Sequence, residues 1–195
     1  MDSRMETTIA GVTWKNPVTT ASGTFGSGRE YGELIDLNRL GAITVKGVSE
    51  EAWKGNPVPR LAETQSGLLN SIGLQNAGAE LFIENDIPFL RQYDTKIIVN
   101  ICGHTLSQYC AVAERFADCD IDMLELNISC PNVEEGGLSF GTDPHVVERV
   151  VKAVRHYVKQ PLIVKLSPEV TDITEIARAA VSGGADALSL INTLR

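Results

Sequence analysis

The chain has 195 residues, of which 43% are hydrophobic and 22% are charged, and its formal net charge at pH 7 is -8. This length and composition are typical of one soluble domain with a well-buried core. The acidic balance and the lack of a Lys/Arg cluster argue against a nucleic-acid surface. No stretch approaches the roughly 18 apolar residues of a membrane span, and residues 1–8 have no apolar signal-peptide core. We therefore expect a cytoplasmic protein.

The four cysteines are scattered over the chain at Cys102, Cys110, Cys119 and Cys130. They include no C-x-x-C pair and no matching histidine spacing, so a zinc site or a disulfide scaffold has weak support. We expect reduced thiols and no bound metal.

The first fifty residues predict a hairpin arm with a turn at Gly11, a core strand, a helix and a second core strand. In chain order these elements cover residues 9–14, 17–23, 31–40 and 42–47. The glycines between positions 23 and 28 lack the G-x-G-x-x-G spacing of a dinucleotide loop, which disfavours a Rossmann fold.

Residues 50–78 contain too many glycines, prolines and amides for a regular element. A long loop inside a compact domain is usually functional. We expect this segment to cover a site.

The remainder of the chain alternates between helix-period and continuous apolar segments. Helices are predicted over residues 79–90, 106–117, 146–158 and 173–180, and strands over residues 96–100, 123–128, 162–166 and 187–191. Asp143-Pro144 precedes the third of these helices and is typical of a helix start.

This alternation is typical of a parallel α/β fold. About six βα units are visible, whereas a closed (β/α)8 barrel takes about 250 residues. The pattern therefore fits either an open sheet or a TIM barrel that is cut short. Polar residues at the carboxyl ends of successive strands favour the barrel, because those ends converge on one mouth. They are Ser22, Lys46, Asn100, Asn127, Lys165 and Asn192. We predict one TIM-barrel domain over residues 1–195, incomplete at its C-terminus.

Cys130 follows the apolar strand 123–128, at a point where Pro131 removes a ladder donor. A thiol among carboxamides and a hydroxyl, before the glycine pair at 136–137, is a candidate acid/base or nucleophile. The alternative is a small buried hydrophobic residue.

Lys46 and Lys165 end or interrupt apolar strands, which is a costly place for an ammonium group unless an acceptor meets it. Each is either a functional cation or part of a structural ion pair or solvated rim. Lys165 alone also suits the Schiff-base lysine of an aldolase-type barrel. That interpretation leaves Cys130 and the asparagines without a role.

Five motifs together resemble the class 1 dihydroorotate dehydrogenases, in that family's order and over essentially the whole chain. They are GNPVPR at 55–60, NSIGLQN at 70–76, NISCPNV at 127–133, VKLSP at 164–168 and INT at 191–193. Residues 21–38 and 140–144 resemble the B-type catalytic subunit more than the A-type homodimer.

The resemblance implies FMN-dependent oxidation of dihydroorotate to orotate in pyrimidine (UMP) biosynthesis, with Cys130 as the base. It also implies that Lys46 and Lys165 contact the flavin and act catalytically. In that scheme Lys165 lies near the pole that gains negative charge, and Lys46 also approaches the substrate. Two residue sets follow from the resemblance. The substrate set is Lys46, Asn70, Ser71, Ile72, Gly73, Leu74, Asn127, Asn132, Asn192 and Thr193, and the flavin set is Ser22, Lys46, Gly47, Asn100, Asn127, Lys165 and Ile191.

In the B type, a second subunit in a heterotetramer carries FAD and a 2Fe-2S cluster and passes electrons to NAD. We expect the same partner here. We also expect that the chain is a fragment ending after the sixth strand, and that it binds flavin poorly, because a barrel's phosphate site commonly lies after strands seven and eight.

Two alternatives stay open. The Ser-Cys-Pro sequence also resembles the pyrimidine-reducing domain of dihydropyrimidine dehydrogenase, although a His usually follows the proline there and Asn132 follows it here. The other is a non-enzymatic, truncated barrel that only binds.

Overall fold

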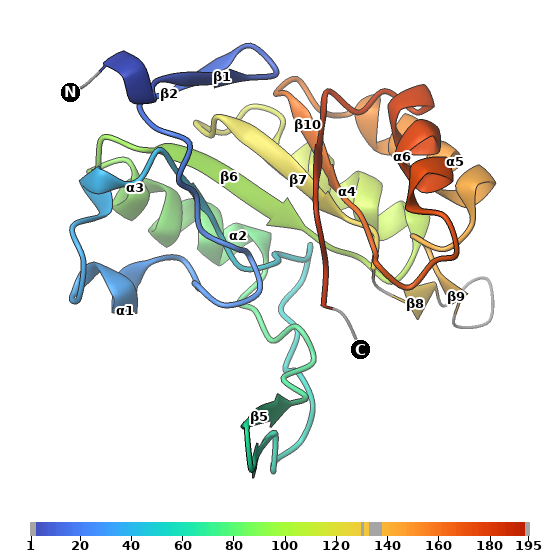
Figure 1. The fold of residues 1–195 in the computed structure, drawn as a ribbon, viewed down its shortest axis with the longest axis horizontal. Helices are drawn as coiled ribbons and strands as arrows, with labels where there is room; N and C mark the ends of the chain where they lie inside the picture. Colours follow the sequence, from blue (N-terminus) through green and yellow to red (C-terminus); the bar gives the residue numbers. More distant parts are fainter. Residues whose placement is uncertain (1–2, 130, 133–137, 194–195) are drawn as a thin grey trace.

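The structure is a computed structural model that describes residues 3–129, 131–132 and 138–193. Its centre is a five-stranded sheet with the strand order β11-β10-β7-β6-β3, in which every neighbouring pair is parallel (Figure 1). The strands are β3 (Ala42–Thr44), β6 (Lys96–Ile101), β7 (Met123–Asn127), β10 (Leu162–Lys165) and β11 (Ala187–Ser189).

The strand order follows the chain order without a reversal. A doubly wound sheet reverses its order at a switch point, whereas the wall of a (β/α)8 barrel runs in one direction. The sheet therefore corresponds to consecutive strands of a barrel wall. Its carboxyl ends all lie on the same side.

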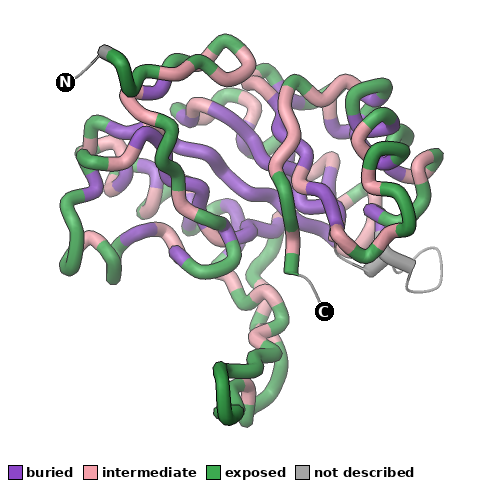
Figure 2. Tube along the Cα trace, in the orientation of Figure 1, coloured by how far each residue is buried: buried purple, intermediate pink, exposed green. Residues whose placement is uncertain are grey.

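Alternate residues of each strand face two different cores, because successive side chains point to opposite faces. In β6, Ile97, Val99 and Ile101 belong to the large cluster that includes the helices. Ile98 instead packs with Trp14 in a smaller cluster on the other face. We call this second side of the sheet the interior face. Both faces are buried along most of the sheet (Figure 2).

Three helices cover the outer face: α4 (Leu106–Phe116), α5 (Pro144–Arg155) and α6 (Ile173–Ser182). Four valines on one side of α5 are completely buried, as their helical spacing predicts: Val147, Val150, Val151 and Val154. The helix predicted over residues 79–90 is present as α2 (Ala79–Leu81), a π-helical turn (Phe82–Asp86) and α3 (Ile87–Leu90). None of the helices in the described ranges is long and apolar enough to cross a membrane.

Asp143 caps the amino terminus of α5, since its Oδ1 accepts hydrogen bonds from the backbone N–H of His145 (2.8 Å) and Val146 (3.1 Å). We expect Asp143→Ala to lower the free energy of unfolding by about 1 kcal/mol, because two helix donors lose their acceptor. Asp143→Ser keeps an acceptor at the same place and should retain most of the stability. Urea denaturation followed by circular dichroism measures both, and an unchanged midpoint for the alanine variant would contradict the capping role.

The predicted hairpin arm is present as β1 (Thr7–Ile9) and β2 (Val12–Trp14), joined through Ala10 and Gly11 at positive φ. It packs against the interior face at the end opposite the strands' carboxyl termini. Trp14, Ile98, Met123 and Ile163 form the core of this contact. The interior is therefore filled at one end, which leaves the carboxyl end for a site.

The strand predicted over residues 17–23 is wrong. Only an isolated parallel bridge between Thr19 and Ala42 is present, so the sheet has five strands rather than six. Hydrogen bonds from the Thr20 side chain replace the backbone hydrogen bonds that a paired strand would form with β3. The Thr20 hydroxyl accepts from the Thr44 backbone N–H (2.9 Å) and donates to the Thr44 carbonyl (3.1 Å). A side chain that bonds the neighbouring backbone competes with regular pairing.

The continuous helix predicted over residues 31–40 is also wrong. The segment has a single helical turn, α1 (Arg29–Gly32), and a short 3-10 helix, Leu37–Arg39. Asp36 caps the second piece by accepting from the Asn38 backbone N–H, which ends any helix that comes before it. Leu34 is 78% exposed and only Leu37 is fully buried, so the apolar spacing does not correspond to one buried face.

The segment 50–78, predicted to be irregular, contains an antiparallel hairpin of β4 (Leu61–Thr64) and β5 (Gly67–Asn70). Residues 55–74, here called the β4–β5 arm, extend from the body on the side toward which β6 points (Figure 1). Three further short elements complete the described chain: a 3-10 turn (Ser3–Met5), β8 (Pro131–Asn132) and β9 (Leu138–Ser139).

Candidate functional site

The carboxyl ends of the strands surround a cavity of about 420 Å³. Here it is called the mouth cavity. Most of the residues that the sequence singled out line it, although they come from segments far apart along the chain. The lining consists of Ser22, Gly23, Lys46, Gly47, Asn70, Ser71, Ile72, Gly73, Leu74, Asn100, Asn127, Ser129, Lys165, Ser167, Glu169, Asn192 and Thr193.

Strand register explains why the polar residues meet. Lys165 is paired with Asn127 across β10 and β7, and Asn100 is paired with Glu125 across β6 and β7. All four lie on the interior face, because each is separated by an even number of residues from Ile163, Met123 or Ile98. The apolar part of this face is covered by the hairpin arm, and its polar part forms the mouth cavity.

Within the described residues, neither lysine is held in an ion pair. Lys165 Nζ donates to the hydroxyl of Ser22 at 3.2 Å, and no carboxylate in the described ranges forms a salt bridge with Lys46 or Lys165. A neutral hydroxyl does not compensate an ammonium charge. The cavity wall therefore carries two available positive charges, with the carboxylate of Glu169 also on the lining. This arrangement favours an anionic ligand over a structural role for the lysines.

Asn127 is oriented by three neighbours. Its Oδ1 accepts from Asn192 Nδ2 (3.0 Å) and from the Ser129 backbone N–H (3.2 Å), and its carbonyl accepts from the Tyr109 hydroxyl. Because the carboxamide oxygen is already engaged, the Nδ2 group is the part of Asn127 that can donate to a ligand. The same contact ties the segment after β11 to β7.

Two buried polar atoms of lining residues have no hydrogen-bond partner among the described residues: Asn100 Oδ1 and Ser129 Oγ. The Asn100 side chain is completely buried, and a Cβ at Gly47 would lie 3.0 Å from its Oδ1. A buried acceptor without a donor costs free energy unless a ligand supplies one. Glycine at position 47 avoids the side chain that would crowd this oxygen.

The β4–β5 arm brings residues 70–74 to the lining. Asn56 Nδ2 donates to the Ser71 carbonyl (3.0 Å), and the Ser71 N–H donates to the Arg60 carbonyl (2.9 Å). Gly73 has φ of 74°, and a Cβ there would lie 2.7 Å from the Asn56 backbone nitrogen. The two sides of the arm are thus held together where the arm meets the cavity, as expected for a segment that covers a site.

Three predicted residues are not placed on the lining. Cys130 lies outside the described residues, and the side chain of Asn132, in β8, is likewise not described. Ile191 follows β11, is 42% exposed and does not line the cavity. Conversely, Gly23, Ser167 and Glu169 line it without having been assigned to the site, and Ser129, the hydroxyl beside Cys130 in the sequence, lines it as well. Ser167 could have been found by alternation, since it is two residues beyond Lys165.

Three cysteines lie in the described part of the chain, and none of these three lines the mouth cavity. Cys102 is buried, Cys110 and Cys119 are partly buried, and none of the three forms a disulfide with another described cysteine. Burial raises the pKa of Cys110, and burial together with the Asp118 charge raises the pKa of Cys119, so both stay protonated at neutral pH. Within the described ranges, no group of histidine, cysteine and carboxylate side chains could hold a metal ion.

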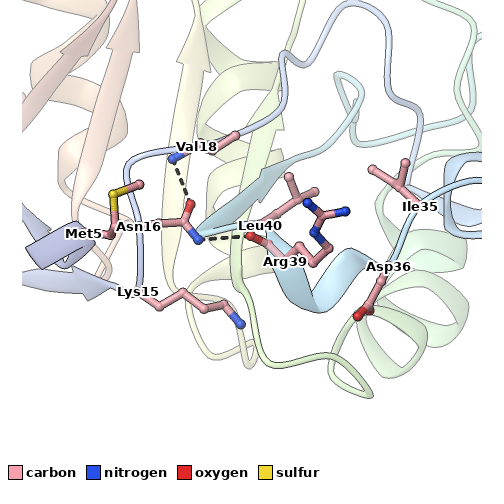
Figure 3. A pocket seen from close by; sticks show the side chains of 8 residues that line it. All are labelled: Met5, Lys15, Asn16, Val18, Ile35, Asp36, Arg39 and Leu40. Carbon is pink, nitrogen blue, oxygen red and sulfur yellow. Dashed lines mark hydrogen bonds between the residues drawn. The ribbon is translucent and has the colours of Figure 1, made fainter. Parts of the chain in front are cut away.

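A second cavity, of about 470 Å³, lies between the segment after β2 and the 3-10 helix Leu37–Arg39 (Figure 3). Its lining has apolar side chains such as Val18 and Ile35, and none of the predicted site residues. Asp36 on its rim accepts hydrogen bonds from the Asn38 side chain and backbone, which lower the pKa of its carboxyl. Its polar groups thus serve local structure, so the mouth cavity is the candidate site.

The sequence profile of the family described as "Dihydroorotate dehydrogenase" matches residues 4–195. The chain belongs to this family. A solved structure of a family member, from Eimeria tenella in complex with ferulenol, superposes with a TM-score of 0.80 at 20% identity, covering 99% of this chain and 60% of that one. This likeness confirms the predicted partial TIM barrel.

Three similar relatives each bear the name dihydroorotate dehydrogenase B (NAD(+)), catalytic subunit. The relative from Alkaliphilus metalliredigens is 68% identical, and the match covers 97% of this chain and 63% of the relative's length. The relative from Alkaliphilus oremlandii is 68% identical (95% and 62%), and that from Lachnoclostridium phytofermentans is 64% identical (96% and 62%). They confirm the predicted B-type assignment. The chain spans less than two thirds of the length of these relatives.

Proposed function

We propose that this chain forms the substrate- and flavin-binding wall of a class 1, B-type dihydroorotate dehydrogenase, which oxidises dihydroorotate to orotate in pyrimidine (UMP) biosynthesis. The observation that carries the proposal is the mouth cavity, where two lysines that pair with no described carboxylate lie near the carboxamides of Asn100 and Asn127, whose orientation is fixed by hydrogen bonds. Relatives with 64–68% identity and that enzyme's name support it.

The residues present fit FMN. Asn100 Oδ1 is a buried acceptor that needs a donor, and glycine at position 47 keeps a side chain from crowding it. We assign Ser22, Lys46, Gly47, Asn100, Asn127, Lys165 and Ile191 to the flavin, as the family resemblance implies. FMN, when bound, would accept the hydride of the substrate. The protein would hold the ring system and place the two ammonium groups beside it, where positive charge favours a ligand that becomes anionic.

Dihydroorotate carries a carboxylate and several amide-like groups, so groups that donate and accept suit it. We assign the substrate to the Asn127 Nδ2 group, to Asn192 and Thr193 after β11, to Lys46, and to residues 70–74 of the β4–β5 arm. Asn132 and Cys130 belong to the same set by resemblance. Cys130 Sγ would take the proton from one ring carbon as the hydride leaves its neighbour.

The relatives' name, "catalytic subunit", implies a partner subunit, and its "NAD(+)" names the acceptor for those enzymes. We propose that this chain likewise works with a subunit that carries FAD and a 2Fe-2S cluster and passes the electrons to NAD. The cytoplasm remains the compartment that the sequence predicts.

The test is an FMN titration followed by visible absorption, with dihydroorotate then added without oxygen. Because the chain alone is expected to bind flavin poorly, we expect bound flavin that bleaches on reduction in the chain extended by the remaining part of a relative. Lys165→Met should weaken both binding and bleaching because the cavity loses a positive charge. Lys159→Met, which removes an exposed lysine that pairs with Asp118 on the surface, should change neither.

The titration is repeated on a chimera in which this chain continues into the remaining part of the Alkaliphilus metalliredigens relative. Bleaching in the chimera alone would show that the cavity needs the longer chain, as predicted for the flavin phosphate. Absence of bleaching in both proteins would contradict the proposed function and favour a chain that only binds.

A further inference from the structure

Glu125 is a buried carboxylate in the wall of the barrel, and the proposed reaction does not use it. It lies in β7 on the interior face and is 5% exposed. Its Oε1 accepts from Asn100 Nδ2 of β6 at 2.6 Å, and its Oε2 accepts from the Ser189 hydroxyl of β11 at 2.8 Å. The single side chain thus connects three strands behind the mouth cavity.

No lysine, arginine or histidine in the described ranges forms a salt bridge with Glu125. Lys165, which lies on the same face, donates to Ser22 instead. A buried carboxylate without a cation is costly, and two neutral donors offset only part of that cost. An apolar residue would serve a purely structural purpose at this position with less expense. The carboxylate therefore calls for a functional reason.

The contact of Glu125 with Asn100 supplies a functional reason for the buried carboxylate. An ionised carboxylate only accepts hydrogen bonds, so the Asn100 atom that faces it must be the amide nitrogen. The carboxamide is consequently held with Oδ1 turned away from Glu125 and beside Gly47, another lining residue of the cavity, and that buried oxygen has no partner among the described residues. The Asn100 carboxamide has two orientations, with Nδ2 or with Oδ1 facing position 125. Without Glu125, the charge-assisted hydrogen bond would no longer make the first of them lower in free energy.

We propose that Glu125 is a positioning residue that, through Asn100, makes this part of the cavity wall accept a hydrogen bond from a ring imide N–H of the ligand. The inference rests on the proposed function and extends it by one residue and one element of specificity. An imide N–H, set between two carbonyl groups, occurs both in the flavin ring and in orotate. A ligand with an alkyl group at that nitrogen has no donor to offer.

The first test compares FMN with 3-methyl-FMN, whose imide nitrogen carries a methyl group, by titration of the wild-type chain and of the chimera. Orotate and 3-methylorotate are compared in the same way on the flavin-loaded protein. We expect the wild type to prefer the unmethylated ligand at the site of contact by about tenfold or more, since a buried acceptor would be left unpaired. A preference for FMN over 3-methyl-FMN alone would show that the flavin ring meets Asn100, and a preference for orotate over 3-methylorotate alone would show that the orotate ring does.

Three variants separate positioning from folding. Glu125→Leu removes the acceptor and should reduce the preference to about twofold or less. Glu125→Gln can still accept from Asn100 Nδ2 while donating to Ser189, so it should restore most of the preference. Ser189→Ala removes the other hydrogen bond of Glu125 and leaves the Asn100 contact, so it should keep the wild-type preference. Equal loss in the leucine and Ser189→Ala variants, or a leucine variant that still discriminates, would overturn the inference.

A second measurement does not need a ligand. The side-chain NH₂ signals of Asn100, assigned by comparison with Asn100→Ser, are recorded by ¹⁵N-edited NMR in each variant. We expect a downfield amide proton in the wild type that is lost in Glu125→Leu, and its persistence there would overturn the positioning role. If the wild type shows this signal and no protein binds flavin, the proposed function fails, and the ligand part of this inference fails with it.

Discussion

Replacing Cys130 by alanine is expected to leave FMN binding unchanged and to lower the rate of flavin reduction by dihydroorotate by about 10²- to 10⁴-fold. This range is typical for the loss of a positioned general base. Cys130 follows Ser129, a residue on the lining of the mouth cavity, so its position in the sequence is suited to the proton that must leave the substrate. Stopped-flow absorption without oxygen measures the rate, in whichever of the chain and the chimera reduces FMN.

Cys119→Ala is the matched control for this experiment. Cys119 lies in the loop after α4 and does not line the cavity. Its thiol donates to the carbonyl of Arg115, within α4, and its raised pKa keeps it protonated. Its removal should therefore leave the reduction rate unchanged. A normal rate in Cys130→Ala would remove this cysteine from the role of base, and equal losses in both variants would point to a general effect of losing a thiol.

Gly41→Ala is expected to destabilise the fold by about 3 kcal/mol, the upper end of the range for overpacking. A Cβ at this position would lie 1.9 Å from the carbonyl oxygen of Asn16, a backbone atom that cannot rotate away. The Gly41 backbone also forms hydrogen bonds with both neighbouring segments, donating to the Val18 carbonyl (2.9 Å) and accepting from the Lys96 N–H (3.2 Å). The methyl group must therefore separate the segment at 16–20 from the edge of the sheet.

Urea denaturation followed by tryptophan fluorescence measures this effect, with Trp14 near the affected segment. Gly23→Ala is the control, because a Cβ there meets nothing within 4 Å. We expect a large shift of the midpoint for Gly41→Ala and almost none for Gly23→Ala. Similar midpoints for Gly41→Ala and the wild type would show that the chain relaxes around the methyl group at little cost.

Buried segments with a strong period could be predicted from the sequence. The helix α5 was identified from valines at helical spacing, and those valines are completely buried. The strands β6, β7 and β10 were identified from continuous apolar runs, because strands buried on both faces need apolar residues at every position. The grouping of Lys46, Asn100, Asn127 and Lys165 at one cavity also followed from the sequence, since the carboxyl ends of parallel strands converge.

Segments whose conformation depends on single polar contacts or on exposed residues were not predicted. At residues 17–23 the Thr20 side chain replaces a backbone ladder, and at residues 31–40 Asp36 ends one turn and caps the next. The β4–β5 hairpin has exposed residues throughout both strands, so no buried face imposes a period on its sequence. The local sequence pattern says little about secondary structure in exposed segments, because burial does not restrict which residues occur there.

The family, the parallel α/β order and the residues at the strand ends thus follow from motifs and periodicity. The contacts that orient those residues are a product of tertiary structure alone. Glu125 meets Asn100 and Ser189, which are 25 and 64 residues away along the chain. Only the register of β6 with β7 and the curvature that brings β11 across the interior place these side chains together, and neither quantity is encoded in a local spacing.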